Sequence, residues 1–196
     1  MQRNMWVGKN GAPAEGTLME PHVLNRQLCV QLGNSLEYPD HRTWDTLLAA
    51  ASQVGSISGE ASKHLEDFLA KMKRMGLEMW QEYYVQTFDL MPKCSLYLSV
   101  HLFGEESFKR AELMAGLKGV YERHSPFEST ELPDHLAVIL KRSTLFGEEE
   151  WSDLVSMCMV PAISKMTRLL EKNGNSYACI LKAVQILLVR LEKVHV

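Results

Sequence analysis

The residues with the clearest chemical potential lie together in one segment, Glu131-Leu132-Pro133-Asp134-His135-Leu136. The segment places two carboxylates and an imidazole at a predicted helix start. Pro133 suits the first helical turn, and Asp134 would stabilise the positive end of the helix dipole. Glu131 and Asp134 would also form an acidic spot for an arginine guanidinium, which favours bidentate carboxylate contacts. Three interpretations stay open at this point: structural, peptide-binding, or catalytic with His135 as general base.

Other patterns that carry chemistry are missing from the sequence. Residues 11–16 have the glycine spacing of a phosphate-binding loop, but Thr17 stands where that loop needs lysine. The segment 55–59 resembles a nucleophile elbow, but Ile57 stands where the serine belongs. None of the seven histidines belongs to an H-E-x-x-H pair. His135 therefore lacks a nucleophile or metal set beside it, and the sequence predicts neither an enzyme nor a cofactor.

Composition and charge narrow the class of protein and its compartment. The formal net charge of −3 argues against nucleic acid as a main partner. The four cysteines are widely scattered without C-x-x-C spacing, so we expect reduced thiols that pack between helices. The N-terminus lacks the apolar core of a secretory signal, and no apolar run approaches the roughly 18 residues that span a bilayer. We therefore expect a cytoplasmic protein without stable membrane insertion.

Apolar residues recur with helical spacing along most of the chain. Leu24, Leu28, Leu32 and Leu36 draw one stripe down a helix that begins at Pro21. Similar stripes follow up to the last helix, and no stretch alternates with period two for long enough to predict a strand. The fold class expected is all-α, a single-domain helical bundle of about eight to ten helices over residues 20–196. Residues 1–19 are expected to form a flexible lead-in.

Several residues predict where individual helices begin and end. Asp40 is a candidate N-cap for a helix whose buried face would hold Trp44, Leu47, Leu48 and Ala51. Ser58, within a predicted loop at 55–59, is a candidate N-cap for the next helix. Pro133 is expected to start a helix and Gly147 to end it, and Pro161 is expected to kink or restart a later one.

The acidic segment carries a family resemblance. It resembles the assembly chaperones of molybdenum-containing oxidoreductases, the NarJ and TorD type, whose recurrent motif is E-x-P-D-H followed by an aliphatic residue. Upstream, Tyr84-Val85-Gln86-Thr87-Phe88-Asp89 is similar to the Y-V-x-T-F-D segment of the nitrate-reductase branch, and Leu36-Glu37-Tyr38-Pro39-Asp40 resembles the end of its first helix. The resemblance covers about residues 22–170. Arg110-Ala111 departs from the usual R-G of the branch.

This resemblance implies a cytoplasmic, system-specific chaperone and not an enzyme. Its partner would be the apo catalytic subunit of a molybdenum oxidoreductase, with nitrate reductase the leading client, bound through an N-terminal or twin-arginine signal segment until the cofactor is inserted. Matched by position, Glu131, Asp134, His135 and Leu136 would lie in the peptide groove. The opposite wall would come from Tyr84, Thr87 and Phe88, which share one helix face, although core packing explains these aromatic residues equally well.

Two alternatives to the chaperone remain. A helical regulatory or scaffold protein would use a similar surface for a different peptide, and a hydrolase would use His135 with a carboxylate. The sequence leaves the oligomeric state open between a monomer and a dimer that exchanges helices.

Overall fold

The computed structural model describes residues 21–90, 94–123 and 125–193, so the predicted lead-in at 1–19 lies outside the described residues. Within these ranges the chain folds into ten α-helices and no strand, which confirms the all-α prediction. In chain order these are α1 (Pro21–Asn34), α2 (His41–Ile57), α3 (Gly59–Met75), α4 (Leu77–Phe88), α5 (Leu98–Phe103), α6 (Phe108–Tyr121), α7 (Leu136–Lys141), α8 (Glu148–Asp153), α9 (Val160–Lys172) and α10 (Tyr177–Lys193).

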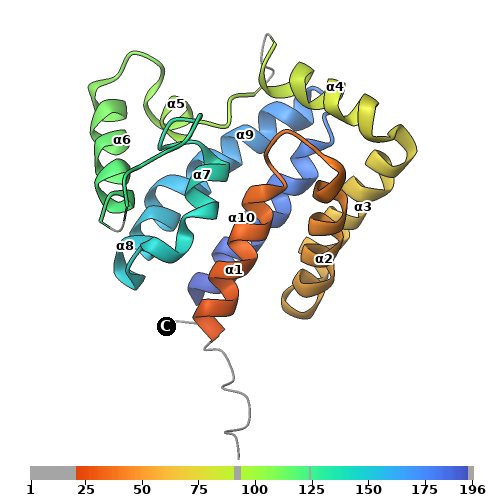
Figure 1. The fold of residues 1–196 in the computed structure, drawn as a ribbon, viewed down its shortest axis with the longest axis horizontal. Coiled ribbons are helices and arrows are strands. Elements are labelled where there is room, and N and C mark those ends of the chain that lie inside the picture. Colours follow the sequence, from red (N-terminus) through yellow and green to blue (C-terminus); the bar gives the residue numbers. More distant parts are fainter. Residues whose placement is uncertain (1–20, 91–93, 124, 194–196) are drawn as a thin grey trace, which may run out of the picture.

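Helices α1 and α10 run through the middle of the molecule, as Figure 1 shows. Helices α2, α3 and α4 lie on one side of this pair, and α5 to α8 lie on the other. Helix α10 packs against α9, α3 and α1, and α1 packs against α7 and α2. The predicted apolar stripe is buried at Leu28 and Leu32 in α1, which confirms that part of the helix prediction. Leu36 is also buried, but it lies in the turn after α1, because the helix ends at Asn34.

Local capping explains where α2 and α3 begin. The carboxylate of Asp40 accepts hydrogen bonds from the backbone N–H groups of Arg42 and Thr43, and the Thr43 hydroxyl accepts one from the Asp40 N–H, which completes a capping box. Ser58 accepts from Ala61 N and caps α3. Both predicted caps are therefore confirmed, but the predicted loop at 55–59 shrinks to Ser58 alone, because α2 continues to Ile57 and α3 begins at Gly59.

Two helix boundaries were predicted incorrectly. Helix α7 begins at Leu136, three residues after Pro133, because the chain before it pairs with another segment instead of coiling. Gly147 precedes α8 as its N-cap, and α7 has already ended at Lys141. The first turn of α8 carries Glu148, Glu149 and Glu150, which is favourable at the positive end of the helix dipole.

The restart predicted at Pro161 is confirmed, with a π-helical segment η2 (Leu154–Met159) between α8 and α9. Proline removes one backbone donor and its ring crowds the carbonyl one turn earlier, which a wider turn can accommodate. Leu48, which was expected on the buried face of α2, is exposed. Among the described residues, none of the helices combines the length and apolar character needed to cross a bilayer.

Helix α1 and helix α7 approach each other unusually closely at Gly33. A Cβ atom at this position would lie 2.9 Å from the Ala137 carbonyl oxygen and 2.9 Å from Cγ of Lys141. Only glycine permits this approach, because such a distance is well inside van der Waals contact. The contact sets the position of α7 and of the acidic segment that precedes it.

Candidate peptide-binding site

The acidic segment is held in place by a short backbone pairing. Leu98 N donates to Asp134 O at 3.0 Å, and Leu136 N donates to Leu96 O at 2.8 Å, which forms one antiparallel bridge between Tyr97 and His135. His135 is the N-cap residue of α7, with extended backbone geometry and no capping bond from its side chain. The pairing fixes the segment from Glu131 to His135 against the chain that enters α5.

Asp134 lies fully inside the bundle, with 0% of its surface exposed. Its Oδ2 accepts hydrogen bonds from Ser99 N at 3.1 Å and from Ser99 Oγ at 2.5 Å. Arg110 Nε donates to the same Ser99 hydroxyl at 3.0 Å, so a chain of polar contacts links α6 to the acidic segment. The predicted direct contact between Asp134 and a peptide is therefore closed in this conformation, because the whole carboxylate is sealed from solvent. Ser99 occupies its Oδ2, and its buried Oδ1 has no hydrogen-bond partner among the described residues. We assign Asp134 a positioning role.

His135 is nearly sealed, with 6% of its surface exposed, and its ring stands edge-on to Tyr97 at 5.1 Å between centroids. Burial lowers the pKa of His135, although the charges of Glu131, Asp134, Glu37 and Asp89 favour its protonated form. The imidazole is therefore neutral near pH 7, and its buried Nδ1 has no hydrogen-bond partner among the described residues. Its fully buried neighbour Leu136 belongs to the core, so it does not line an open groove.

Besides Asp134, three carboxylates act electrostatically on His135, and we call Glu37, Asp89 and Glu131 the acidic cluster. Glu131 is half-buried and its Oε2 accepts a 2.5 Å hydrogen bond from the Tyr97 hydroxyl. Burial, followed by the nearby Glu131 charge, raises the pKa of Asp89. Glu37 forms a 2.6 Å ion pair with Lys141. The cluster therefore draws its carboxylates from three separate chain segments, and Lys141 already balances the charge of Glu37.

The predicted aromatic wall lies mainly in the core. Tyr84 is buried, its hydroxyl donates to Leu36 O at 3.2 Å, and burial raises its pKa further than the neighbouring acids do. Thr87 is also buried, and it accepts a 2.8 Å hydrogen bond from Asn175 Nδ2. Phe88 is half-buried against Tyr84, at 5.1 Å between ring centroids. The core-packing interpretation therefore describes Tyr84 and Thr87, and only Phe88 keeps an open side.

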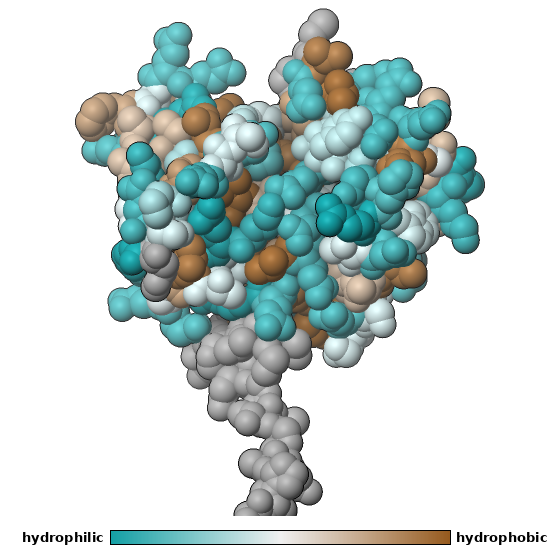
Figure 2. Space-filling model, in the orientation of Figure 1, coloured by the Kyte–Doolittle hydropathy of each residue, from teal (hydrophilic) through white to brown (hydrophobic). Residues whose placement is uncertain are grey.

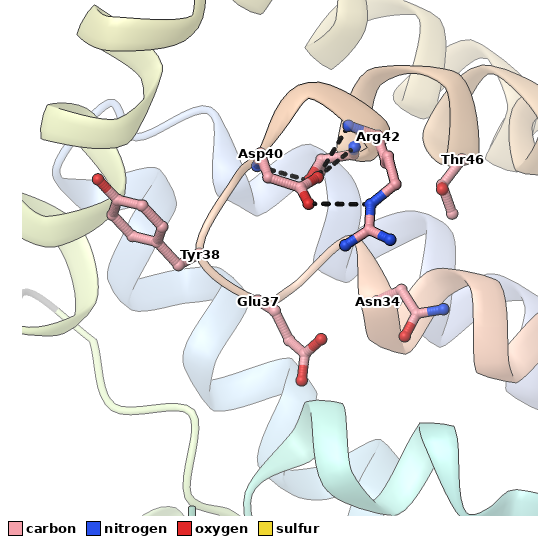
Figure 3. Close-up of a pocket in the computed structure, with 7 residues that line it drawn as sticks. Asn34, Glu37, Tyr38, Asp40, Arg42 and Thr46 are labelled. Atoms are coloured by element: carbon pink, nitrogen blue, oxygen red, sulfur yellow. Dashed lines mark hydrogen bonds and ion pairs between the residues drawn. The ribbon is translucent and has the colours of Figure 1, made fainter. Parts of the chain in front are cut away.

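The open apolar surface beside the acidic cluster comes instead from Tyr38 and Leu90, which are 53% and 68% exposed. Tyr38 stands edge-on to Tyr84 at 5.8 Å, so it extends the buried aromatic cluster to the surface. Figure 3 shows Tyr38 directed toward α4 and Glu37 directed toward α7 from the same connection between α1 and α2. Hydrophobic side chains also gather at the end of α4 in Figure 2, among hydrophilic ones.

Two shallow pockets meet at Tyr38. One, of about 330 Å³, is polar and contains Glu37 and the Asp40–Arg42 ion pair of Figure 3. The other, of about 370 Å³, lies along α4 and joins apolar with acidic side chains: Tyr38, Glu78, Gln81, Glu82, Val85, Gln86 and Leu90. An apolar strip bordered by carboxylates suits a peptide that combines apolar and basic residues.

The sequence prediction did not include Glu37, Tyr38, Tyr97 and Leu90 among its candidate site residues. It ranked Asp89 below the candidates that it did include. Both Glu37 and Tyr38 belong to the segment 36–40 that carries part of the family resemblance, so a signal for them existed in the sequence. The contact of Tyr97 could not be predicted from local pattern, because its partner Glu131 lies 34 residues away in the sequence.

Comparison with known proteins places the chain in a family. The nitrate reductase delta subunit family matches residues 55–173. The nitrate reductase molybdenum cofactor assembly chaperone NarJ of Escherichia coli strain K12 is 29% identical over 147 residues, which are 73% of this chain and 61% of that protein. The probable nitrate reductase molybdenum cofactor assembly chaperone NarJ of Bacillus subtilis strain 168 is 30% identical over 167 residues, 82% of this chain and 86% of that protein.

A solved structure shares the fold. The crystal structure of a putative redox enzyme maturation protein from Archaeoglobus fulgidus superimposes with a TM-score of 0.56 over 92% of this chain and 99% of that one, at 21% identity.

Proposed function

Because the chain belongs to the nitrate reductase delta subunit family, we propose that it is a system-specific assembly chaperone for a molybdenum oxidoreductase of the nitrate reductase type. Its client is the apo catalytic subunit, which it holds through an N-terminal or twin-arginine segment while the cofactor is inserted. Both relatives are named as assembly chaperones, which supports a binding protein in preference to an enzyme.

The observation that carries this proposal is the acidic cluster beside an exposed aromatic side chain. Glu37, Asp89 and Glu131 all act electrostatically on His135, and burial together with the Glu131 charge raises the pKa of Asp89. The repulsion between Asp89 and Glu131 is relieved when a cation arrives beside them, and Glu37 already pairs with Lys141. A guanidinium or ammonium group of the client meets these carboxylates, and its neighbouring apolar residues cover Tyr38 and Leu90.

The predicted site residues take different roles in this proposal. Glu131 contacts the client directly, and Phe88 contacts it through its open side. Asp134 and His135 hold the turn that presents Glu131, because both are sealed and Asp134 is fixed by Ser99. Tyr84, Thr87 and Leu136 support the wall from inside the core.

Titration calorimetry with a synthetic peptide of the N-terminal segment of a nitrate reductase catalytic subunit tests the proposal. Glu131→Gln and Asp89→Asn are expected to weaken binding by roughly threefold to tenfold each, since partly exposed charge contacts are screened. Tyr38→Ala is expected to weaken it by removing the apolar contact. The matched control is Glu128→Gln, an exposed glutamate three residues before the acidic segment, which should bind like the unmodified chain.

Two outcomes would contradict this assignment. The first is unchanged affinity in all three site variants, which would remove the acidic cluster from the interface. The second is an equal loss with Glu128→Gln, which would indicate long-range attraction by overall charge in place of a specific contact. A salt titration separates these cases, because contacts in a defined site are screened less than attraction at a distance.

A further inference from the structure

A second groove lies on the other side of the molecule, between α6 and η2, and we call it the α6–η2 groove. Its volume is about 470 Å³, and its floor is apolar: Leu113, Leu117, Val120, Phe146, Leu154 and Met157. Met157 is 62% exposed, so a large side chain there lies open to water. Gly116 adds no side chain to the wall, and an added Cβ there would meet nothing within 4 Å. The groove is therefore apolar, wide and open to an incoming side chain.

The rim of the α6–η2 groove is acidic. Glu150 is neutralised by a bidentate contact with Arg123, with bonds of 2.6 and 2.9 Å. Glu112 and Asp153 also line the groove, and neither has an ion-pair partner within the part of the chain that the structure describes. The groove thus favours a ligand with a large apolar centre and basic residues on both flanks.

The chain itself contains a segment with this chemistry. Its first ten residues include Met5-Trp6-Val7, with Arg3 on one flank and Lys9 on the other, and no acidic residue. We infer that this segment, referred to as the basic-apolar segment (residues 3–9), occupies the α6–η2 groove of the same chain. In this arrangement the apolar centre covers Leu113 and Met157, and the flanking cations meet Glu112 and Asp153.

The start of α1 lies close enough for this contact. Arg26, in the second turn of α1, pairs with Glu148 at 3.4 Å and lies 4.4 Å over the Trp151 ring, so α1 begins beside α8. The segment 8–20 can span about 40 Å when extended, at roughly 3.3 Å per residue. A tether of this length gives an effective concentration on the order of millimolar, so a weak contact suffices for occupancy. The inference is independent of the client, because the groove is separate from the acidic cluster.

Cysteine cross-linking in the full chain tests the inference with a thiol already in place. Cys158 lines the groove and is half-buried, whereas Cys179 on α10 is equally half-buried but lies outside it. Burial raises the pKa of both thiols, so neither is activated by its surroundings as a thiolate. With Val7→Cys, mild oxidation at low protein concentration should give an intramolecular disulfide to Cys158 in excess over Cys179, since bridging requires Cα atoms within about 7 Å.

Filling the groove supplies the second arm of the test. Gly116→Leu in the Val7→Cys background should abolish the Cys158 disulfide without disturbing the fold, because the site is open and leucine favours a helix. Ala111→Leu, an exposed substitution on α6 outside the groove, should leave the disulfide unchanged. Equal yields at Cys158 and Cys179, a disulfide only between two chains, or a disulfide that survives Gly116→Leu would each overturn the inference.

Discussion

Replacing Asp134 should destabilise the fold before it affects any ligand. The carboxylate is fully buried and accepts two hydrogen bonds from Ser99, at 3.1 and 2.5 Å. Hydrogen bonds to a charged group contribute about 1.5–3 kcal/mol each, and Asp134→Ala also leaves the Ser99 N–H buried without a partner. We expect a loss of about 3–5 kcal/mol in the free energy of unfolding. That is a large share of the roughly 5–15 kcal/mol typical of a domain.

Urea unfolding followed by circular dichroism measures this loss. Asp134→Asn keeps an acceptor oxygen for both donors and should lose roughly half as much, since only the charge is removed. Glu128→Ala, an exposed control, should stay within about 0.5 kcal/mol of the unmodified chain. The m-value should not change, because the surface exposed on unfolding is the same.

Two results would refute the expectation that Asp134 stabilises the fold without contacting a ligand. A cost below about 1 kcal/mol for Asp134→Ala would mean that the two hydrogen bonds contribute little net stability. A tenfold loss of peptide affinity in Asp134→Asn, with unchanged stability, would mean that the carboxylate reaches the ligand directly. Ser99→Ala gives an independent check, because a double-mutant cycle with Asp134→Ala should show coupling of about 1–3 kcal/mol.

Three further predictions concern the surroundings of the acidic cluster. Asp89→Asn should leave stability unchanged or raise it by up to about 0.5 kcal/mol in urea unfolding, because burial and the Glu131 charge both disfavour the ionised carboxylate and raise its pKa; a clear loss would contradict this. Gly33→Ala should destabilise the chain by about 2 kcal/mol or more, because its Cβ meets backbone 2.9 Å away, whereas Gly55→Ala, with 3.5 Å to its nearest neighbour, should stabilise α2 by about 0.5–1 kcal/mol. Because burial lowers the pKa of His135, the unfolded chain takes up this proton at a higher pH than the folded chain does. Stability should therefore fall as the pH drops below about 6.5, and His135→Gln should flatten that slope. An identical slope in both proteins would refute this prediction.

The local signals of the sequence determined much of the fold. The spacing of Leu28 and Leu32 sets the buried face of α1, because helical periodicity follows from backbone geometry alone. Asp40 and Ser58 cap α2 and α3 by accepting hydrogen bonds from backbone N–H groups in the first turn of each helix. Both caps could therefore be predicted from residues that are close in the sequence. The residues of the acidic segment were likewise identified from the sequence.

Tertiary packing decided what those residues do. The sequence predicted that the carboxylate of Asp134 would be open to a peptide. In the structure it is buried inside the bundle, where Ser99, 35 residues away in the sequence, donates a hydrogen bond to it. Pro133 does not start a helix, because backbone pairing with the chain before α5 satisfies the donors and acceptors of this segment first. The acidic cluster brings together Glu37, Asp89 and Glu131 from three segments, and no local sequence pattern encodes which segments come together in the fold. Residue types and helical period act over a few positions, whereas burial and charge clustering depend on which helices pack together.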